Sequence, residues 1–206
     1  ADGEDHDASG GSRAAGAGSV YIFQNTGGTW SEVQKIVASD RGSSDRFGYS
    51  LDISGDFAII GSAFEDHDTA GINSLSNAGS AYVFQNNSGT WSEIQKLTAF
   101  QRESADNFGY SVSISGNYII VGARQEDEDA NESNTLDGAG SAYIFQYSNG
   151  TWNQVQKIVA SDRDASDRFG SSVSISGDYA IVGALSERHD VLDNNSKNGA
   201  GSAYIF

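Results

Sequence analysis

A tandem repeat runs through the whole chain and constrains its fold more than any other feature. The segment Phe-Gly-Tyr-Ser at 47–50 returns as Phe-Gly-Tyr-Ser at 108–111 and as Phe-Gly-Ser-Ser at 169–172. Two further sets of landmarks keep the same spacing, namely Trp30, Trp91 and Trp152, and Tyr21, Tyr82, Tyr143 and Tyr204. Because three independent landmarks keep one period without an insertion, the chain consists of about 3.4 copies of one structural unit.

We predict four β-strands in each copy. In the copy that begins at Phe108, residues 110–115 alternate apolar side chains with serine, which is typical of a strand with one better buried face. Residues 118–121 are apolar without alternation, which indicates a strand covered on both faces. The third and fourth strands are expected over 141–146 and 151–158, on either side of an Asn-Gly turn. No segment shows a sustained helical period, so the predicted fold class is all-β.

A four-stranded antiparallel sheet of this size cannot bury both of its faces alone. Stacking successive sheets solves the problem, and the radial arrangement of such stacks is the β-propeller. An open β-solenoid is the main alternative, although its coils are usually much shorter than the repeat of this chain. We therefore expect a β-propeller of four-stranded antiparallel blades.

The repeat resembles the FG-GAP repeat of integrin α-subunit propellers and their bacterial relatives. Phe108-Gly109 stands in the "FG" position and Gly122-Ala123 in the "GA" position, and the likeness recurs in every copy. The resemblance implies part of a seven-bladed propeller in an extracellular protein that serves ligand binding or adhesion, or that accompanies an enzyme. Integrin-type repeats bind calcium in an Asp-x-Asp-x-Asp-Gly loop between the first two strands. That loop is only Ser-Gly-Asp or Ser-Gly-Asn here, so those calcium ligands cannot be transferred to this sequence.

We treat residues 1–206 as a single propeller region. It divides into a partial repeat 1–46, two full repeats 47–107 and 108–168, and a partial repeat 169–206. Seven repeats of this length need about twice this chain, so the sequence is interpreted as a fragment of a longer propeller.

Charge and composition exclude several classes of function. The formal net charge of −16 disfavours nucleic acid and anionic membrane surfaces as partners. No apolar run approaches the roughly 18 residues of a membrane span, so membrane insertion is not expected. The chain has no cysteine, and it lacks a Gly-x-Ser-x-Gly elbow and a phosphate loop, which favours binding over catalysis.

The acidic loop after the second strand is the best candidate for a site. It supplies several carboxylates within one turn, and oxygen ligands of this kind suit Ca²⁺. The predicted metal ligands are Glu4, Asp5, Asp7, Glu65, Asp66, Asp68, Glu126, Asp127, Asp129 and Asp190. The alternative interpretation is a solvated turn whose carboxylates accept hydrogen bonds from backbone amides.

Other recurring residues are interpreted more simply. The histidines His6, His67 and His189 occupy equivalent positions, but successive blades keep such loops apart, so a shared metal site is not expected. The Asp-Arg or Asp-Asn pair before each Phe-Gly is read as a turn, with a ligand-facing rim as the alternative. The tryptophans are expected to pack between blades, with sugar stacking as the alternative.

We predict a secreted or cell-surface binding module that presents its loops to a protein or glycan ligand, with Ca²⁺ as the expected stabilising ion. One alternative is an accessory or catalytic propeller of a secreted enzyme that degrades polysaccharide or phosphoester. The other is a structural spacer or filament subunit, in which unpaired blade edges support self-association.

Overall fold

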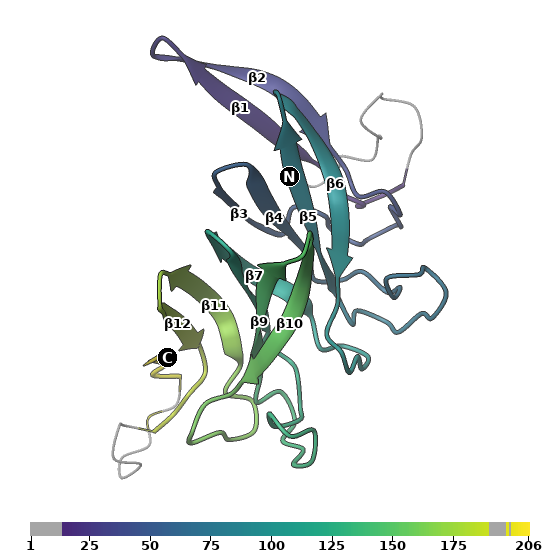
Figure 1. Ribbon diagram of the computed structural model, residues 1–206. Coiled ribbons are helices and arrows are strands. Elements are labelled where there is room, and N and C mark those ends of the chain that lie inside the picture. Colours follow the sequence, from purple (N-terminus) through teal and green to yellow (C-terminus); the bar gives the residue numbers. More distant parts are fainter. Residues whose placement is uncertain (1–13, 190–196, 198) are drawn as a thin grey trace.

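The computed structural model describes residues 14–189, 197 and 199–206, and these form β-strands joined by turns and loops, without a helix (Figure 1). The strands are β1 (Val20–Thr26), β2 (Thr29–Ile36), β3 (Ser50–Ser54), β4 (Phe57–Ser62), β5 (Ser80–Asn87), β6 (Thr90–Leu97), β7 (Phe108–Ser115), β8 (Tyr118–Ala123), β9 (Ser141–Ser148), β10 (Thr151–Ile158), β11 (Phe169–Ser176), β12 (Tyr179–Ala184) and β13 (Ser202–Ile205). Within this described part there is therefore no helix long and apolar enough to cross a membrane.

The strands form four antiparallel sheets in which sequence neighbours pair. Two sheets are complete blades, β3-β4-β5-β6 and β7-β8-β9-β10, while β1-β2 and β11-β12-β13 are parts of the same pattern. The third and fourth strands share an irregularity at one place in each copy, between Ile22 and Phe23 and between Val83 and Phe84. The all-β class and the repeated four-stranded unit are confirmed. The first three predicted strands were too short, since β7 begins at Phe108, β8 continues to Ala123 and β9 to Ser148.

Apolar side chains lie both within each blade and between neighbouring blades. In β8 every residue after the first is buried, which agrees with a strand covered on both faces. Phe108 makes edge contacts with Tyr143 and Phe145 of its own blade. Trp152 instead packs edge-on against Phe57 of the preceding blade, with ring centroids 5.6 Å apart. The second contact joins one blade to the next.

Two glycines permit very close stacking of neighbouring blades, namely the glycine of the Phe-Gly pair and a glycine in the second strand of the preceding blade. Gly109 has a φ of +85° and its carbonyl oxygen lies against Gly61 of the preceding blade. A Cβ atom on Gly61 would lie 2.1 Å from that oxygen, and Gly122 has the same relation to Gly170. A side chain would therefore push the inner strands of neighbouring blades apart.

A glutamine clamp joins the outer strands at the same interval. Gln95 donates from Nε2 to the Trp152 carbonyl over 2.7 Å, and its Oε1 accepts from the Trp152 amide over 2.8 Å. Gln34 makes the same pair of hydrogen bonds with Trp91. The side-chain amide thus pairs with the next blade as a strand backbone would.

Antiparallel pairing places the connections of each blade on two opposite ends. The loop between the second and third strands leaves from the same end as the connection to the next blade. The short hairpins leave from the other end, towards the upper left of Figure 1. The long loops of successive blades therefore share one side of the molecule, which we call the loop side.

Candidate functional site

Each of the long loops begins with a buried glutamate. The loops cover residues 63–79 and 124–140, and of the third the structure describes residues 185–189, 197 and 199–201; we call them the acidic loops. The exposed fractions of Glu65, Glu126 and Glu187 are 0%, 2% and 0%. A buried carboxylate needs a cation or hydrogen-bond donors to offset its lost hydration.

In both complete blades, a lysine of the fourth strand, which is the outer strand, forms an ion pair with this glutamate. Lys157 of β10 places Nζ 3.1 Å from Oε1 of Glu126, and the Tyr143 hydroxyl donates to Oε2 over 2.5 Å. In the preceding blade, Lys96 of β6 places Nζ 3.0 Å from Oε2 of Glu65. These ion pairs tie the acidic loop to the outer edge of its own blade.

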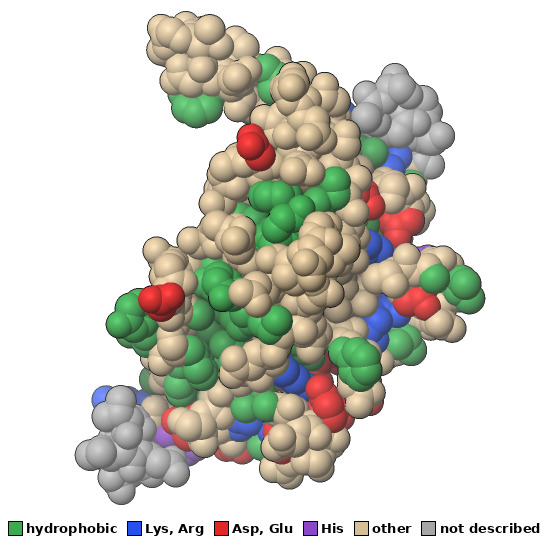
Figure 2. All heavy atoms as spheres, in the orientation of Figure 1, with side chains coloured by type: hydrophobic (Ala, Val, Ile, Leu, Met, Phe, Trp, Pro, Cys, Tyr) green, Lys and Arg blue, Asp and Glu red, His purple; other side chains and the backbone are tan. Residues whose placement is uncertain are grey.

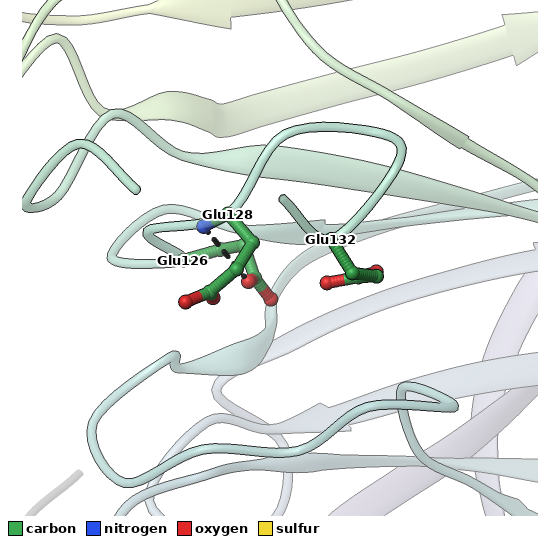
Figure 3. Close-up of side chains that lie close together, drawn as sticks. All are labelled: Glu126, Glu128 and Glu132. Atoms are coloured by element: carbon green, nitrogen blue, oxygen red, sulfur yellow. Dashed lines mark hydrogen bonds between the residues drawn. The ribbon is translucent and has the colours of Figure 1, made fainter. Parts of the chain in front are cut away.

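Three glutamates of the second acidic loop lie close together (Figure 3). Carboxylate oxygens of Glu126, Glu128 and Glu132 come within 4.8 Å of one another. Lys157 Nζ lies 3.0 Å from both oxygens of Glu132, so its ammonium group already binds two of the three carboxylates. Burial, followed by a hydrogen bond with Glu126, raises the pKa of Glu128 to about 7. The cluster thus holds a protein cation and a carboxyl group that binds a proton as the pH falls through about 7.

The second carboxylate of the first two acidic loops closes each of these loops on itself. Asp66 accepts a hydrogen bond at Oδ1 from the Asn77 amide over 2.8 Å. Asp127 accepts one from the Gly138 amide over 2.7 Å. Each bond spans eleven residues, so this aspartate fixes where the two ends of the loop meet.

The fourth position of the acidic motif forms a tight turn. Asp68 accepts the amides of Ala70 and Ile72 at Oδ1, both over 3.0 Å. These bonds, with that from Ile72 the strongest, lower the pKa of Asp68 to about 2. In the next blade Asp129 accepts the Asn131 amide over 2.8 Å, and amide hydrogen bonds lower its pKa as well. These aspartates therefore stay ionised and satisfy the backbone.

In the first two acidic loops, an arginine from the connection between blades binds carbonyl oxygens of the loop. Arg102 donates to the carbonyls of Asp66 and Asn73 over 3.0 and 3.3 Å. Arg163 binds the two equivalent carbonyls of the next blade over 2.7 and 3.1 Å. Oxygens that resemble ligands for a metal ion thus face a guanidinium group.

The aspartate before each Phe-Gly pair is buried. Asp45, Asp106 and Asp167 are 6%, 4% and 1% exposed, and Asp106 accepts the Glu103 amide over 2.7 Å. Burial and then the charge of Glu126 raise the pKa of Asp106 to about 8. Burial likewise raises the pKa of Asp45 and of Asp167 to about 6. These contacts support the interpretation of a turn rather than a ligand-facing rim.

Comparison with known families agrees with this repeated architecture. A model described as the FG-GAP repeat matches residues 30–84, 91–145 and 152–206. The chain belongs to the FG-GAP repeat family. No curated protein matches it. The FG-GAP match covers each outer strand, acidic loop and inner strand described above, and it supports propeller blades as the architecture.

The predicted metal ligands lie in separate acidic loops, and each loop belongs to a different FG-GAP blade. Glu65, Asp66 and Asp68 lie in one acidic loop, and Glu126, Asp127 and Asp129 lie in the next. Glu4, Asp5, Asp7 and Asp190 fall outside the described residues. His67 and His189 each lie beside the glutamate of their own loop, with Nδ1 3.2 and 3.3 Å from a carboxylate oxygen.

The sequence analysis did not identify the lysine and arginine side chains that bind the acidic loops. Lys96, Lys157, Arg102 and Arg163 hold the acidic loops, and none was singled out from the sequence. A signal was present, because three of the four lysines of the chain recur at the period of the repeat, namely Lys35, Lys96 and Lys157. A lysine that recurs in step with a glutamate is a candidate for its partner.

Proposed function

We propose that the chain is a binding module of a secreted or cell-surface protein, and that it displays the tips of its acidic loops to a ligand. The tips are residues 69–74 and 130–135, most of which are exposed. FG-GAP membership supports a propeller that binds ligands. Binding residues are concentrated on loops that a rigid scaffold positions.

The acidic loops combine hydrogen bonds that recur in two blades with tips whose sequences differ, and this contrast supports the proposal. Arg102 and Arg163 bind equivalent carbonyls in two blades, and Asp66 and Asp127 close both loops in the same way. The tips read Thr-Ala-Gly-Ile-Asn-Ser in one blade and Ala-Asn-Glu-Ser-Asn-Thr in the next. Ile72 is 78% exposed at the first tip. An apolar side chain held out on a fixed frame is suited to contact with a partner.

The net negative charge of the chain limits the classes of ligand that can bind to the loop tips. The chain has a formal net charge of −16, and Figure 2 shows acidic and basic side chains gathered along the loop side. A strongly anionic ligand is repelled at long range by this net charge. We therefore propose a neutral glycan or a protein surface with basic groups as the partner.

Replacement of Ile72 tests the display of the tips. We expect Ile72→Ser to weaken binding at least tenfold, about 1.4 kcal/mol, to a ligand found on a glycan array or a panel of purified extracellular proteins. Asn87→Ala is the matched control, because Asn87 is exposed on a hairpin at the opposite end. Equal weakening by both variants, or no ligand in either panel, would contradict the proposal.

We also propose that Ca²⁺ stabilises the acidic loops by binding Asp68 and Asp129, which we call the outer aspartates. Asp68 and Asp129 keep their charge at all ordinary pH values, whereas Glu126 is engaged by Lys157. Millimolar Ca²⁺ is expected to raise the melting temperature above that of an EDTA-treated sample. Asp68→Asn combined with Asp129→Asn is expected to remove most of the rise. The same melting temperature in Ca²⁺ and in EDTA would remove the cation from the proposal.

A further inference from the structure

A groove lies between the outer strands of the two complete blades. It has a volume of about 320 Å³ and is formed by β6, by the connection that follows β6, and by β10. The buried side chains of Phe145 and Trp152 line it, together with Thr69 from the tip of the first acidic loop. Its volume lies at the lower end of the range of small-ligand sites, roughly 300–1,000 Å³. Because both blades are complete, the walls of the groove depend on no other blade.

Four residues that line this groove depart from the repeat, although the other two copies agree with each other at these positions. They are Thr98, Phe100, Asn153 and Gln154, at positions that hold Val, Ser, Ser and Glu in both other copies. Packing between blades is common to the whole repeat, so it does not explain changes at one interface only. Departures that gather in one groove indicate a task beyond packing.

Phe100 gives the groove an exposed aromatic ring. At the preceding interface, Ser39 donates to the Glu93 carboxylate from both its amide and its hydroxyl, over 2.9 and 2.8 Å. The Phe100 amide keeps the equivalent hydrogen bond, to Oε1 of Gln154 over 3.1 Å. Its side chain is 88% exposed, more than any other large apolar side chain in the described part of the chain. The backbone thus preserves the contact between blades, and the ring is left accessible to a ligand.

Polar groups of the groove retain unused hydrogen-bonding capacity. Oε1 of Gln154 accepts the amide of the neighbouring blade, but among the described residues its Nε2 has no acceptor. Asn153 donates from Nδ2 to Ser148 and Thr151, and its Oδ1 has no donor there. The Thr98 hydroxyl likewise makes no hydrogen bond to this part of the chain. A donor, an acceptor and a hydroxyl suit the hydroxyl groups of a sugar, each of which both donates and accepts.

The groove offers no unpaired charge to a ligand. Lys96 is the only charged residue among those that line it, and its side chain is 7% exposed. Its Nζ lies 2.6 Å from Asp40 and 3.0 Å from Glu65, so two carboxylates already neutralise it. At the preceding interface the carboxylate of Glu93 stands where this groove has an amide. A charged ligand would lose hydration here without gaining a counterion, which favours a neutral one.

We propose that this groove binds one ring of a neutral saccharide. The apolar C–H face of the sugar stacks on Phe100 and removes the aromatic ring from water. The sugar hydroxyls accept from Nε2 of Gln154 and donate to Oδ1 of Asn153. The site rests on the binding function proposed above, and it selects a neutral glycan over a basic protein surface as the ligand.

The position of Thr69 connects the groove with the displayed tip. Thr69 is the first residue of the tip 69–74 and also lines the groove. A saccharide of several rings, with one ring on Phe100, is therefore directed towards the exposed Ile72 of the same tip.

Amide NMR spectra recorded with neutral disaccharides test the proposal. The probes are lactose, maltose, cellobiose and diacetylchitobiose, each at about 10 mM. At least one is expected to shift the amide signals of Phe100 and Gln154, with a dissociation constant of about 1 mM. Phe100→Ser, which introduces the residue of the other two copies, is expected to weaken this binding at least tenfold with an unchanged melting temperature. Val155→Ser is the matched control, because Val155 is 52% exposed on β10 and does not line the groove.

The groove is the wrong site if none of the four disaccharides shifts these amides, or if Phe100→Ser leaves the binding of a disaccharide unchanged. A protein partner that shifts the same amides when no saccharide does assigns the groove to protein docking and overturns the proposal. Ile72→Ser distinguishes the groove from the tips. A ligand weakened by Ile72→Ser and not by Phe100→Ser removes the groove and keeps the function of the tips, whereas the reverse result supports the groove alone.

Discussion

Lys157→Met is expected to lower the free energy of unfolding by about 3–5 kcal/mol, because removal of one partner leaves a buried charge without its counterion. Glu126 is 2% exposed, and Lys157 also neutralises Glu132. For a domain of this size the loss corresponds to a fall in melting temperature on the order of 10 °C. Urea denaturation followed by tryptophan fluorescence measures the change.

Two controls separate this effect from the loss of any surface lysine. Lys197→Met removes an exposed lysine and is expected to change stability by less than about 0.5 kcal/mol. Glu126→Gln added to Lys157→Met is expected to recover much of the lost stability, since the orphaned charge is removed. A loss below about 1 kcal/mol for Lys157→Met would show instead that the pair behaves as a surface ion pair.

Asp106→Asn is expected to stabilise the protein at alkaline pH and to have little effect at acidic pH. Burial raises the pKa of Asp106 to about 8, far above the roughly 3.9 of an unfolded chain. A folded pKa above the unfolded value means that the folded state binds the additional proton. Its contribution is therefore complete below about pH 4 and is lost as the pH rises towards about 8.

Asparagine resembles the protonated acid and keeps an acceptor for the Glu103 amide. We expect nearly equal stability of the two proteins at about pH 3.5 and an advantage of several kcal/mol for Asp106→Asn at pH 9, since each pKa unit corresponds to about 1.36 kcal/mol. Urea midpoints across this range measure the difference. An Asp106→Asn protein that is less stable at pH 9 would show that the ionised carboxylate is favourable.

The sequence was sufficient for the architecture because the repeat supplies the same evidence several times. The alternation in β7 and the uninterrupted apolar run in β8 identified the two strands, and β8 is buried after its first residue as expected. The alternation did not predict the burial within β7, where Ser113 is buried like Val112 and Ile114. The strand ends were less certain. Phe108 and Gly109 begin β7 because they contact the preceding blade, and no local pattern reveals a contact of that kind.

The acidic loops were located correctly, but the partners of their carboxylates were not foreseen. Glu126 and Lys157 lie far apart in the sequence, and each resembles a solvent-exposed residue when viewed alone. Burial of both depends on how the outer strand crosses the base of the loop, which is a tertiary feature. The arginine contacts have the same origin, since Arg102 binds backbone carbonyls whose direction only the folded loop defines.

A crystal structure of the protein crystallised with millimolar Ca²⁺ tests most directly whether lysine and arginine side chains hold the acidic loops in place. The account predicts Lys157 Nζ between Glu126 and Glu132, about 3 Å from oxygens of both, with any Ca²⁺ confined to the outer aspartates. A Ca²⁺ ion bound by Glu126, Glu128 and Glu132, with the lysine turned away, would contradict it.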